Sequence, residues 1–239
     1  MPETPLKVFI GYDPAEDDAY SVCERSMRAT SSAPLAIEPL SLEALRMAGL
    51  YQRTFYVEDG QRYDTLDGKP FSTEFSFSRF LVPALTQWQG WALFCDSDFL
   101  WRDDVAKMFE HADESRAALV VQHDHHPREE RKMRAGQRQQ TYHRKNWSSL
   151  VLWNCAHPMN RYLTPFMVNH QPGWWLHGFT WLNDGQIGNL PPAWNWLDGY
   201  SSPDIHPRAV HYTSGTPDVP GHENAAHADE WRGYLNGDQ

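Results

Sequence analysis

The stretch at residues 91–98, Trp91-Ala-Leu-Phe-Cys-Asp96-Ser-Asp98, joins an apolar run to two closely spaced carboxylates. The apolar part has the length and composition of a buried strand. Asp96 and Asp98 follow it at an i, i+2 spacing, which keeps both side chains on one side of an extended chain. Ligands of open α/β folds bind at the carboxyl ends of parallel strands. The stretch therefore predicts an α/β protein with a carboxylate pair in its ligand site.

Two neighbouring carboxylates repel each other unless positive charge lies between them or in front of them. A divalent cation with oxygen ligands removes that repulsion, and it also holds a diphosphate. The alternative is structural, with Asp96 and Asp98 forming a turn and capping the helix that we expect at residues 105–111. Both interpretations stay open on these residues alone.

The rest of the chain alternates short apolar runs with segments that favour helix. We expect helices at residues 16–29 and 105–111, and Ser41 has the character of an N-cap for a further short helix. The polar, turn-rich residues 51–70 suit a loop or hairpin. Alternating strands and helices predict a mainly parallel, doubly wound sheet. Its other strands are expected at residues 6–11, 34–40, 117–121 and 150–153.

Length and composition indicate one globular domain. The chain has 239 residues, of which 41% are hydrophobic, enough for a substantial core. We expect this domain at residues 1–217, followed by a polar, loosely packed tail at residues 218–239. The formal net charge of −10 argues against a nucleic-acid partner, because such binding depends on neutralising phosphates.

The cysteines and the first residues of the chain both indicate the cellular compartment of the protein. The three cysteines are few, odd in number and partly placed in apolar runs, which is typical of reduced thiols in a core, and they are Cys23, Cys95 and Cys155. The first residues lack the apolar run of a signal peptide, and no stretch is long and apolar enough for a membrane span. The sequence therefore predicts a cytoplasmic protein.

Three further features each allow two interpretations. Residues 127–145 hold seven of the 21 basic residues, and they form either a solvated face or a lid or contact surface for an anionic acceptor or membrane. Residues 123–126, His-Asp-His-His, suit a polar loop better than a zinc site, because crowded ligands wrap an ion poorly. Residues 174–196 hold five of the eleven tryptophans, which serve either core packing or sugar stacking.

The run Phe94-Cys-Asp-Ser-Asp-Phe-Leu100 resembles the metal-binding motif of GT-A-fold glycosyltransferases, particularly glycosyltransferase family eight, which includes glycogenin and bacterial galactosyltransferases. Four other segments are similar to motifs of that family, and all five follow in the family's order over residues 8–215. The four are the first strand at 8–13, the Arg-containing helix at 77–85, the Asp-Gln-Asp-type segment at 183–189 and the late His-x-x-Gly motif at 210–215.

The resemblance implies a GT-A fold, a Rossmann-like nucleotide-diphospho-sugar transferase with a central mixed, mainly parallel sheet. It implies transfer of a hexose from a UDP-sugar to a hydroxyl acceptor such as a glycan, with retention through a covalent intermediate or a same-face substitution. It implies Mn²⁺ or Mg²⁺ held by Asp96, Asp98 and His211. The donor is expected to contact Tyr12, Asp13, Tyr20, Arg79, Ser97 and Gly215. Asp184 is expected to bind sugar hydroxyls, and Gln186 to lie on the far face of the anomeric carbon.

The chain also departs from the family pattern. The family's Lys-Pro-Trp, whose Lys meets the diphosphate, is replaced by Thr-Pro-Asp at residues 216–218, which leaves neutralisation to the metal and another basic group. The family's Asn-Ala-Gly is replaced by Trp-Ser-Ser at residues 147–149.

Two other classes of protein stay open. A sugar nucleotidyltransferase needs a Gly-rich basic loop after its first strand, whereas residues 11–18 are acidic. A non-catalytic carbohydrate-binding protein would use the tryptophans and has no need of the carboxylate pair.

Overall fold

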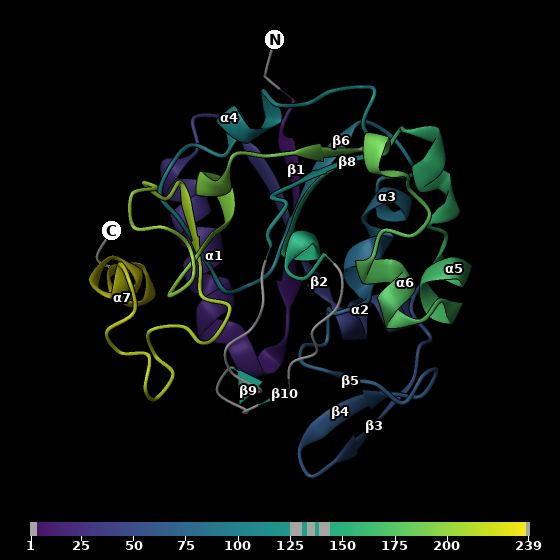
Figure 1. Ribbon diagram of the computed structural model, residues 1–239, viewed down its shortest axis with the longest axis horizontal. Helices are drawn as coiled ribbons and strands as arrows, with labels where there is room; N and C mark the ends of the chain where they lie inside the picture. The colour runs from purple at the N-terminus through teal and green to yellow at the C-terminus, as the bar shows by residue number, and fades with distance from the viewer. Residues whose placement is uncertain (1–3, 125–130, 133–136, 139–143, 238–239) are drawn as a thin grey trace.

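Six strands form the central sheet (Figure 1), and they are β1 (Leu6–Tyr12), β2 (Leu35–Ser41), β6 (Trp91–Cys95), β8 (Ala118–Val120), β11 (Leu150–Asn154) and β12 (Ile187–Asn189). The computed structural model describes residues 4–124, 131–132, 137–138 and 144–237. The strand order is β12-β8-β11-β6-β1-β2, and β11 alone among these six runs antiparallel to its neighbours. The predicted mixed, mainly parallel sheet is therefore confirmed.

Both faces of this sheet are buried. In β6, Ala92 and Phe94 belong to one core cluster, whereas Leu93 and Cys95 belong to the other. This alternation is the pattern of a strand covered on both sides, because successive side chains point to opposite faces. The short strand predicted from the apolar run is thus buried as expected, and it delivers its carboxyl end to the edge of a rigid sheet.

Helices cover the two faces in separate groups (Figure 1). One core cluster is covered by α1 (Asp17–Thr30) and α4 (Ala106–Phe109). The other is covered by α2 (Leu42–Met47), α3 (Val82–Leu85), α5 (Pro165–His170) and α6 (Gly173–His177). α2 begins where expected, because the Ser41 side chain accepts a hydrogen bond from the Ala44 backbone N–H.

A second, smaller sheet continues from the end of β6. It consists of β7 (Phe99–Trp101), β14 (Ala209–His211) and β13 (Trp196–Leu197). β7 and β14 pair antiparallel, with His211 opposite Phe99. The Tyr212 N–H also donates to the Asp98 carbonyl oxygen at 3.0 Å. This pairing fixes the chain around Asp98 beside the end of β14.

The polar segment at residues 51–70 forms a hairpin. β3 (Phe55–Glu58), β4 (Gln61–Asp64) and β5 (Pro70–Phe71) make a three-stranded antiparallel sheet that lies below the main sheet in Figure 1. The remaining short elements are β9 (Arg131–Lys132), β10 (Gln137–Arg138), and the 3₁₀ turns η1 (Pro14–Glu16), η2 (Ser78–Leu81), η3 (Trp147–Ser149), η4 (Pro158–Tyr162), η5 (Asp184–Gln186) and η6 (Pro192–Asn195).

The C-terminal segment packs more firmly than its composition predicts. Residues 228–236 form helix α7 (Ala228–Asn236), which lies outside α1 in Figure 1. Trp231 is 1% exposed and packs in a cluster with Val22 of α1 and Val210 of β14. The expectation of a loosely packed tail is therefore wrong, because two apolar side chains hidden in a polar sequence, Trp231 and Tyr234, dock the helix. The division of the chain at residue 217 stays a prediction.

Within the described part of the chain, none of the helices has the length and apolar character that crossing a bilayer requires. The basic segment at residues 127–145, with its expected role as a lid or contact surface, lies largely outside the described residues.

Candidate metal centre and adjoining cavity

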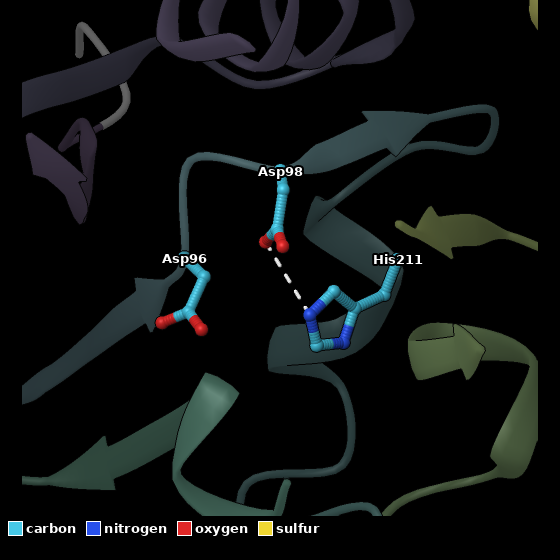
Figure 2. A group of neighbouring side chains, drawn as sticks. All are labelled: Asp96, Asp98 and His211. Carbon is cyan, nitrogen blue, oxygen red and sulfur yellow. Dashed lines mark ion pairs between the residues drawn. The ribbon is translucent and has the colours of Figure 1, made fainter. Parts of the chain in front are cut away.

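Asp96, Asp98 and His211 come together where the two sheets meet (Figure 2). One potential ligand atom from each lies within 4.8 Å of the others, and this is the only such group of three found among the described residues. Asp96 directly follows β6, Asp98 directly precedes β7, and His211 ends β14. The antiparallel pairing of β7 with β14 closes the group. The three residues predicted as metal ligands therefore form a cluster that could hold a metal ion.

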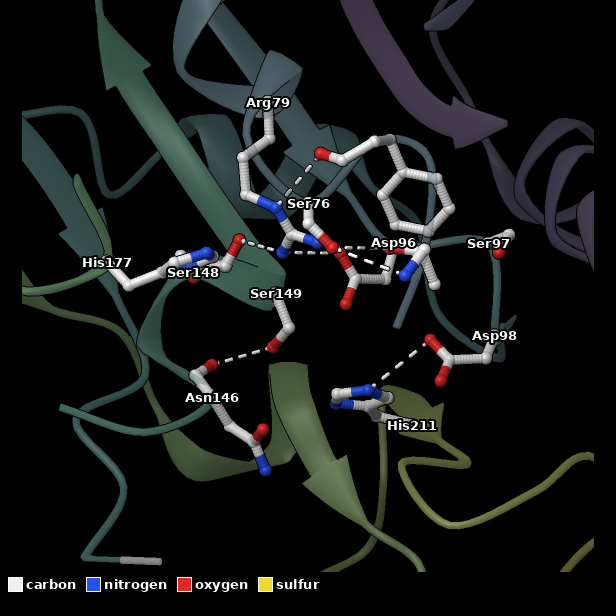
Figure 3. A network of polar contacts seen from close by, with 12 residues as sticks. Ser76, Arg79, Asp96, Ser97, Asp98, Asn146, Ser148, Ser149, His177 and His211 are labelled. Carbon is white, nitrogen blue, oxygen red and sulfur yellow. Dashed lines mark hydrogen bonds and ion pairs between the residues drawn. The ribbon is translucent and has the colours of Figure 1, made fainter. Parts of the chain in front are cut away.

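A chain of hydrogen bonds fixes the tautomer of His211. The Ser149 hydroxyl donates its one proton to the Asn146 carbonyl oxygen at 2.6 Å, so it accepts from the Asn195 amide Nδ2 at 3.0 Å. The Asn195 Oδ1 then faces His211 Nδ1 at 2.8 Å and can only accept. His211 therefore carries its proton on Nδ1. Figure 3 shows the hydrogen bond between Ser149 and Asn146 and the close approach of His211 to Asp98.

The other imidazole nitrogen faces a carboxylate. His211 Nε2 lies 3.3 Å from Asp98 Oδ1, and both side chains are buried. Two acceptor atoms this close repel each other unless a proton or a cation lies with them. A donor set of two carboxylates and one imidazole suits Mn²⁺, which takes oxygen and nitrogen ligands. The residues present therefore fit a divalent metal ion.

Packing holds the imidazole ring in place. Phe99 stacks on His211 with ring centroids 4.5 Å apart and an angle of 16° between the planes. Metal-binding histidines are usually oriented by a hydrogen-bond partner on their second nitrogen. For His211 that partner is Asn195. Cys95 offers no competing thiolate, because burial and the neighbouring Cys23 thiol raise its pKa.

Arg79 provides positive charge to the first carboxylate. Its Nη1 lies 2.7 Å from Asp96 Oδ1 and donates to the Ser148 carbonyl oxygen at 2.9 Å. The guanidinium also lies over the rings of Phe75 and Phe94, at 5.3 and 5.0 Å from their centroids. These contacts hold Arg79 in one position (Figure 3). The residue predicted to reach the donor thus binds a candidate metal ligand in this structure.

A cavity of about 1080 Å³, open to solvent, adjoins the cluster. Asp96, Asp98 and Arg79 line it, and so do residues from the β4–β5 region and from α6. Its further charged or aromatic lining residues are Glu16, Asp67, Lys69, Phe71, Phe75, Phe77, Lys145, Trp174 and His177.

The residues expected at the nucleotide lie near the end of β1. Tyr12 and Tyr20 pack edge to face, with centroids 5.2 Å apart, and burial raises the pKa of Tyr20. Asp13 is buried and accepts from the Glu74 N–H and from Arg62 Nη1, both at 3.0 Å. None of these predicted residues is among those that line the cavity.

Ser97 lies between Asp96 and Asp98 in the sequence, and Gly215 follows His211 by four residues. The buried Ser97 hydroxyl donates to Glu16 Oε2 at 3.2 Å, and Glu16 lines the cavity. A Cβ added at Gly215 would lie 2.7 Å from the His222 ring, so this glycine allows a close approach of two loops. Donor contact by Ser97 and Gly215 stays a prediction.

The predicted catalytic residues Asp184 and Gln186 are not brought into the cavity lining. The Asp184 side chain is 93% exposed and forms an ion pair with Arg144. The Gln186 side chain accepts from the Asn183 N–H at 3.0 Å and completes a capping box. Arg144 also donates to the Gly178 carbonyl oxygen at 2.6 Å, so Asp184 is tied to the segment that precedes β11. Their catalytic role stays a prediction.

Some tryptophans of residues 174–196 pack in the core, and one is exposed where it could stack on a sugar. Trp181, Trp194 and Trp196 are buried, whereas Trp174 is 63% exposed and lines the cavity. His123 and Asp124 form part of no metal-ligand group among the described residues, and His125 and His126 lie outside them.

Sequence reasoning did not single out three residues of the site, Asn195, Ser149 and Lys145. Asn195 belongs to none of the five motif segments, and Ser149 lies in the Trp-Ser-Ser departure at residues 147–149. Lys145 belongs to the basic segment at residues 127–145, although it is 8% exposed and lines the cavity. Its place at the end of that segment, five residues before the start of β11, is the available signal.

The fold of the chain is similar to that of several solved structures. No protein-family model matches the chain. The WbbM bifunctional glycosyltransferase superposes with a TM-score of 0.61 at 11% identity, over 98% of this chain and 50% of its own. GlyE of Streptococcus pneumoniae TIGR4 gives 0.60 at 15% identity, over 98% and 60%. Galactosyltransferase LgtC, solved with donor and acceptor sugar analogs, gives 0.53 at 12% identity, over 97% and 96%. The chain thus spans only about half of WbbM, and its fold is the GT-A fold of these glycosyltransferases.

A sequence relative defines the family. Protein CDI of Arabidopsis thaliana is 46% identical over 232 residues, which cover 95% of this chain and 85% of Protein CDI. The chain belongs to the same family as Protein CDI.

Proposed function

We propose that this chain is a metal-dependent glycosyltransferase that moves a hexose from a UDP-sugar to a hydroxyl acceptor with retention, as in glycosyltransferase family eight. The observation that carries the proposal is the cluster of Asp96, Asp98 and His211, with Asp96 and Asp98 lining a large cavity. The GT-A fold supports the same conclusion, because the solved structures that share it are glycosyltransferases.

Asp96, Asp98 and His211 would hold the metal, with Mn²⁺ as the best fit to the donor set and Mg²⁺ as the alternative. When bound, the ion supplies Lewis acidity, which stabilises the charge of a departing diphosphate. Arg79 orients the Asp96 carboxylate, and Asn195 keeps the proton of His211 away from the metal side. The protein residues thus organise the site before any donor binds.

The remaining roles are part of the same proposal. Tyr12, Asp13 and Tyr20 contact the nucleotide, and Ser97 and Gly215 lie beside the diphosphate. The acceptor enters along Trp174, whose exposed indole offers a flat face to a sugar ring. A reducing compartment such as the cytoplasm suits the three cysteines, which are free and buried.

Asp184 and Gln186 are proposed to act on the transferred sugar. In this structure Asp184 pairs with Arg144, so its contribution requires the sugar to approach that ion pair. Turnover of Asp184→Asn tests the assignment directly. Unchanged turnover in that variant would remove Asp184 from the reaction.

The test of the proposed function is calorimetric titration of UDP into the protein with and without Mn²⁺. We expect UDP binding that depends on Mn²⁺, and loss of that dependence in Asp98→Asn. Asp103→Asn is the matched control, because Asp103 follows the same stretch but pairs with Lys107 at the surface, outside the cavity lining. Absence of UDP binding by the native protein under every condition would refute the assignment to UDP-sugars.

A further inference from the structure

The cavity needs more positive charge than the metal cluster supplies. Its acidic lining residues are Glu16, Asp67, Asp96 and Asp98, and its basic ones are Lys69, Arg79 and Lys145. The two carboxylates that would hold a divalent ion balance its charge, and Arg79 lies against one of them, Asp96. A donor brings a dianionic diphosphate into this space. Burying those charges is unfavourable without a further cation beside them.

Lys145 is placed to provide that cation. It is only 8% exposed, and it lines the same cavity as Asp96 and Asp98. The other lysine of the lining, Lys69, is exposed on the hairpin. The charge of a buried lysine attracts an anion more strongly than the charge of an exposed one, because water screens it less.

The backbone around Lys145 is held on both sides. Arg144 donates to the Gly178 carbonyl oxygen at 2.6 Å, pairs with Asp184 and lies 5.2 Å from the Trp147 ring centroid. Trp147 Nε1 donates to the His123 carbonyl oxygen at 2.9 Å. Asn146 has a positive φ of 65°, which turns the chain sharply after Lys145. The backbone at Lys145 is thus held in place before a ligand arrives, which lowers the entropy lost on binding.

We infer that Lys145 binds the diphosphate of the donor and stabilises the diphosphate that leaves. This inference rests on the proposed function. It assigns to the segment before β11 the cation that the sequence departure at residues 216–218 leaves unassigned. Lys145 acts by charge, so its effect should fall on phosphate-bearing ligands and not on the metal ion.

The experiment compares Lys145→Met with the native protein in two titrations. The first follows Mn²⁺ alone through the electron paramagnetic resonance signal of the free ion, and the second follows UDP by calorimetry in saturating Mn²⁺. We expect Lys145→Met to bind Mn²⁺ as tightly as the native protein or more tightly, because a neighbouring positive charge is gone. We expect its UDP affinity to fall about ten- to hundredfold, the range for losing a hydrogen bond to a charged group.

Two further variants separate charge from packing. Lys145→Arg keeps the charge and should restore most of the UDP affinity, and Lys69→Met, on the exposed side of the cavity, should change it by less than about twofold. If native protein binds UDP and Lys145→Met binds it equally well, the inference is overturned. It is also overturned if Lys145→Met weakens Mn²⁺ and UDP in parallel, since that result means a structural role in the metal site. If native protein binds no UDP at all, the proposed function fails first and the inference falls with it.

Discussion

Replacing Asn195 by leucine should weaken metal binding without touching a metal ligand. Asn195 is fully buried, and its Oδ1 accepts from His211 Nδ1 at 2.8 Å. Leucine has nearly the same size and shape but accepts no hydrogen bond. Nothing then stabilises the tautomer of His211 with its proton on Nδ1. The tautomer with its proton on Nε2 can donate to Asp98 Oδ1, which lies 3.3 Å away in the native structure. That proton occupies the position of the metal.

The size of the effect follows from the kind of contact that is lost. Removing the partner of a metal-binding histidine lowers metal affinity by about ten- to hundredfold. That factor corresponds to about 1.4–2.7 kcal/mol. The variant should also lose about 1–3 kcal/mol of folding free energy for each buried polar group left unpaired. Asn195→Asp keeps an acceptor for Nδ1 and should bind the metal as well as the native protein or better, because a carboxylate raises the basicity of the imidazole.

The assay is a Mn²⁺ titration monitored by electron paramagnetic resonance, with thermal unfolding as a check on folding. Asn160→Leu is the matched control. Asn160 is equally buried, but its side chain binds the carbonyl oxygens of Ala117 and Asn154, away from the metal cluster. The reasoning is refuted if folded Asn195→Leu binds Mn²⁺ like the native protein, or if Asn195→Asp loses as much affinity as Asn195→Leu.

Three other outcomes are expected. Arg53→Met should reduce the folding free energy by about 3–5 kcal/mol in urea unfolding, because it leaves Asp64, 1% exposed, without its buried ion-pair partner; a loss below 1 kcal/mol contradicts this. Burial raises the pKa of the Cys155 thiol from 9.0 to about 11, so the stability it contributes is complete below pH 9.0 and is lost as the pH rises to about 11. Cys155→Ala should remove up to about 2–3 kcal/mol of that alkaline decline, and an identical decline in both proteins argues against it. Trp174→Ala should slow sugar transfer to an acceptor while leaving Mn²⁺-dependent UDP binding intact; equal loss of both would place Trp174 at the donor.

The sequence predicts best what is decided locally. The apolar run of β6, the N-cap at Ser41 and the alternation of strands with helices each depend on neighbouring residues, and each is confirmed. Asp96 and Asp98 were identified for the same reason. His211 was placed with them only through a resemblance, since no local pattern reveals that β14 pairs with β7.

Features that depend on side chains meeting across the fold were missed. Asn195 contacts His211 only because η6 and β14 lie side by side, and no pattern in the sequence predicts this contact. Lys145 is buried at the end of a basic segment, which composition cannot show. Trp231 likewise docks a helix in a stretch whose average character is polar.

The docking of α7 links the C-terminal segment to the metal cluster. Trp231 and Tyr234 pack with Val210, the residue before His211, and with Tyr212, the residue after it. The Tyr212 hydroxyl donates to the Ala226 carbonyl oxygen at 2.8 Å, and its backbone N–H donates to Asp98. α7 therefore packs against β14, which carries His211, and against Tyr212, whose backbone N–H connects β14 to Asp98. Since the contacts that set the His211–Asp98 spacing run through Tyr212, the geometry of the site depends on a helix that contributes no residue to it.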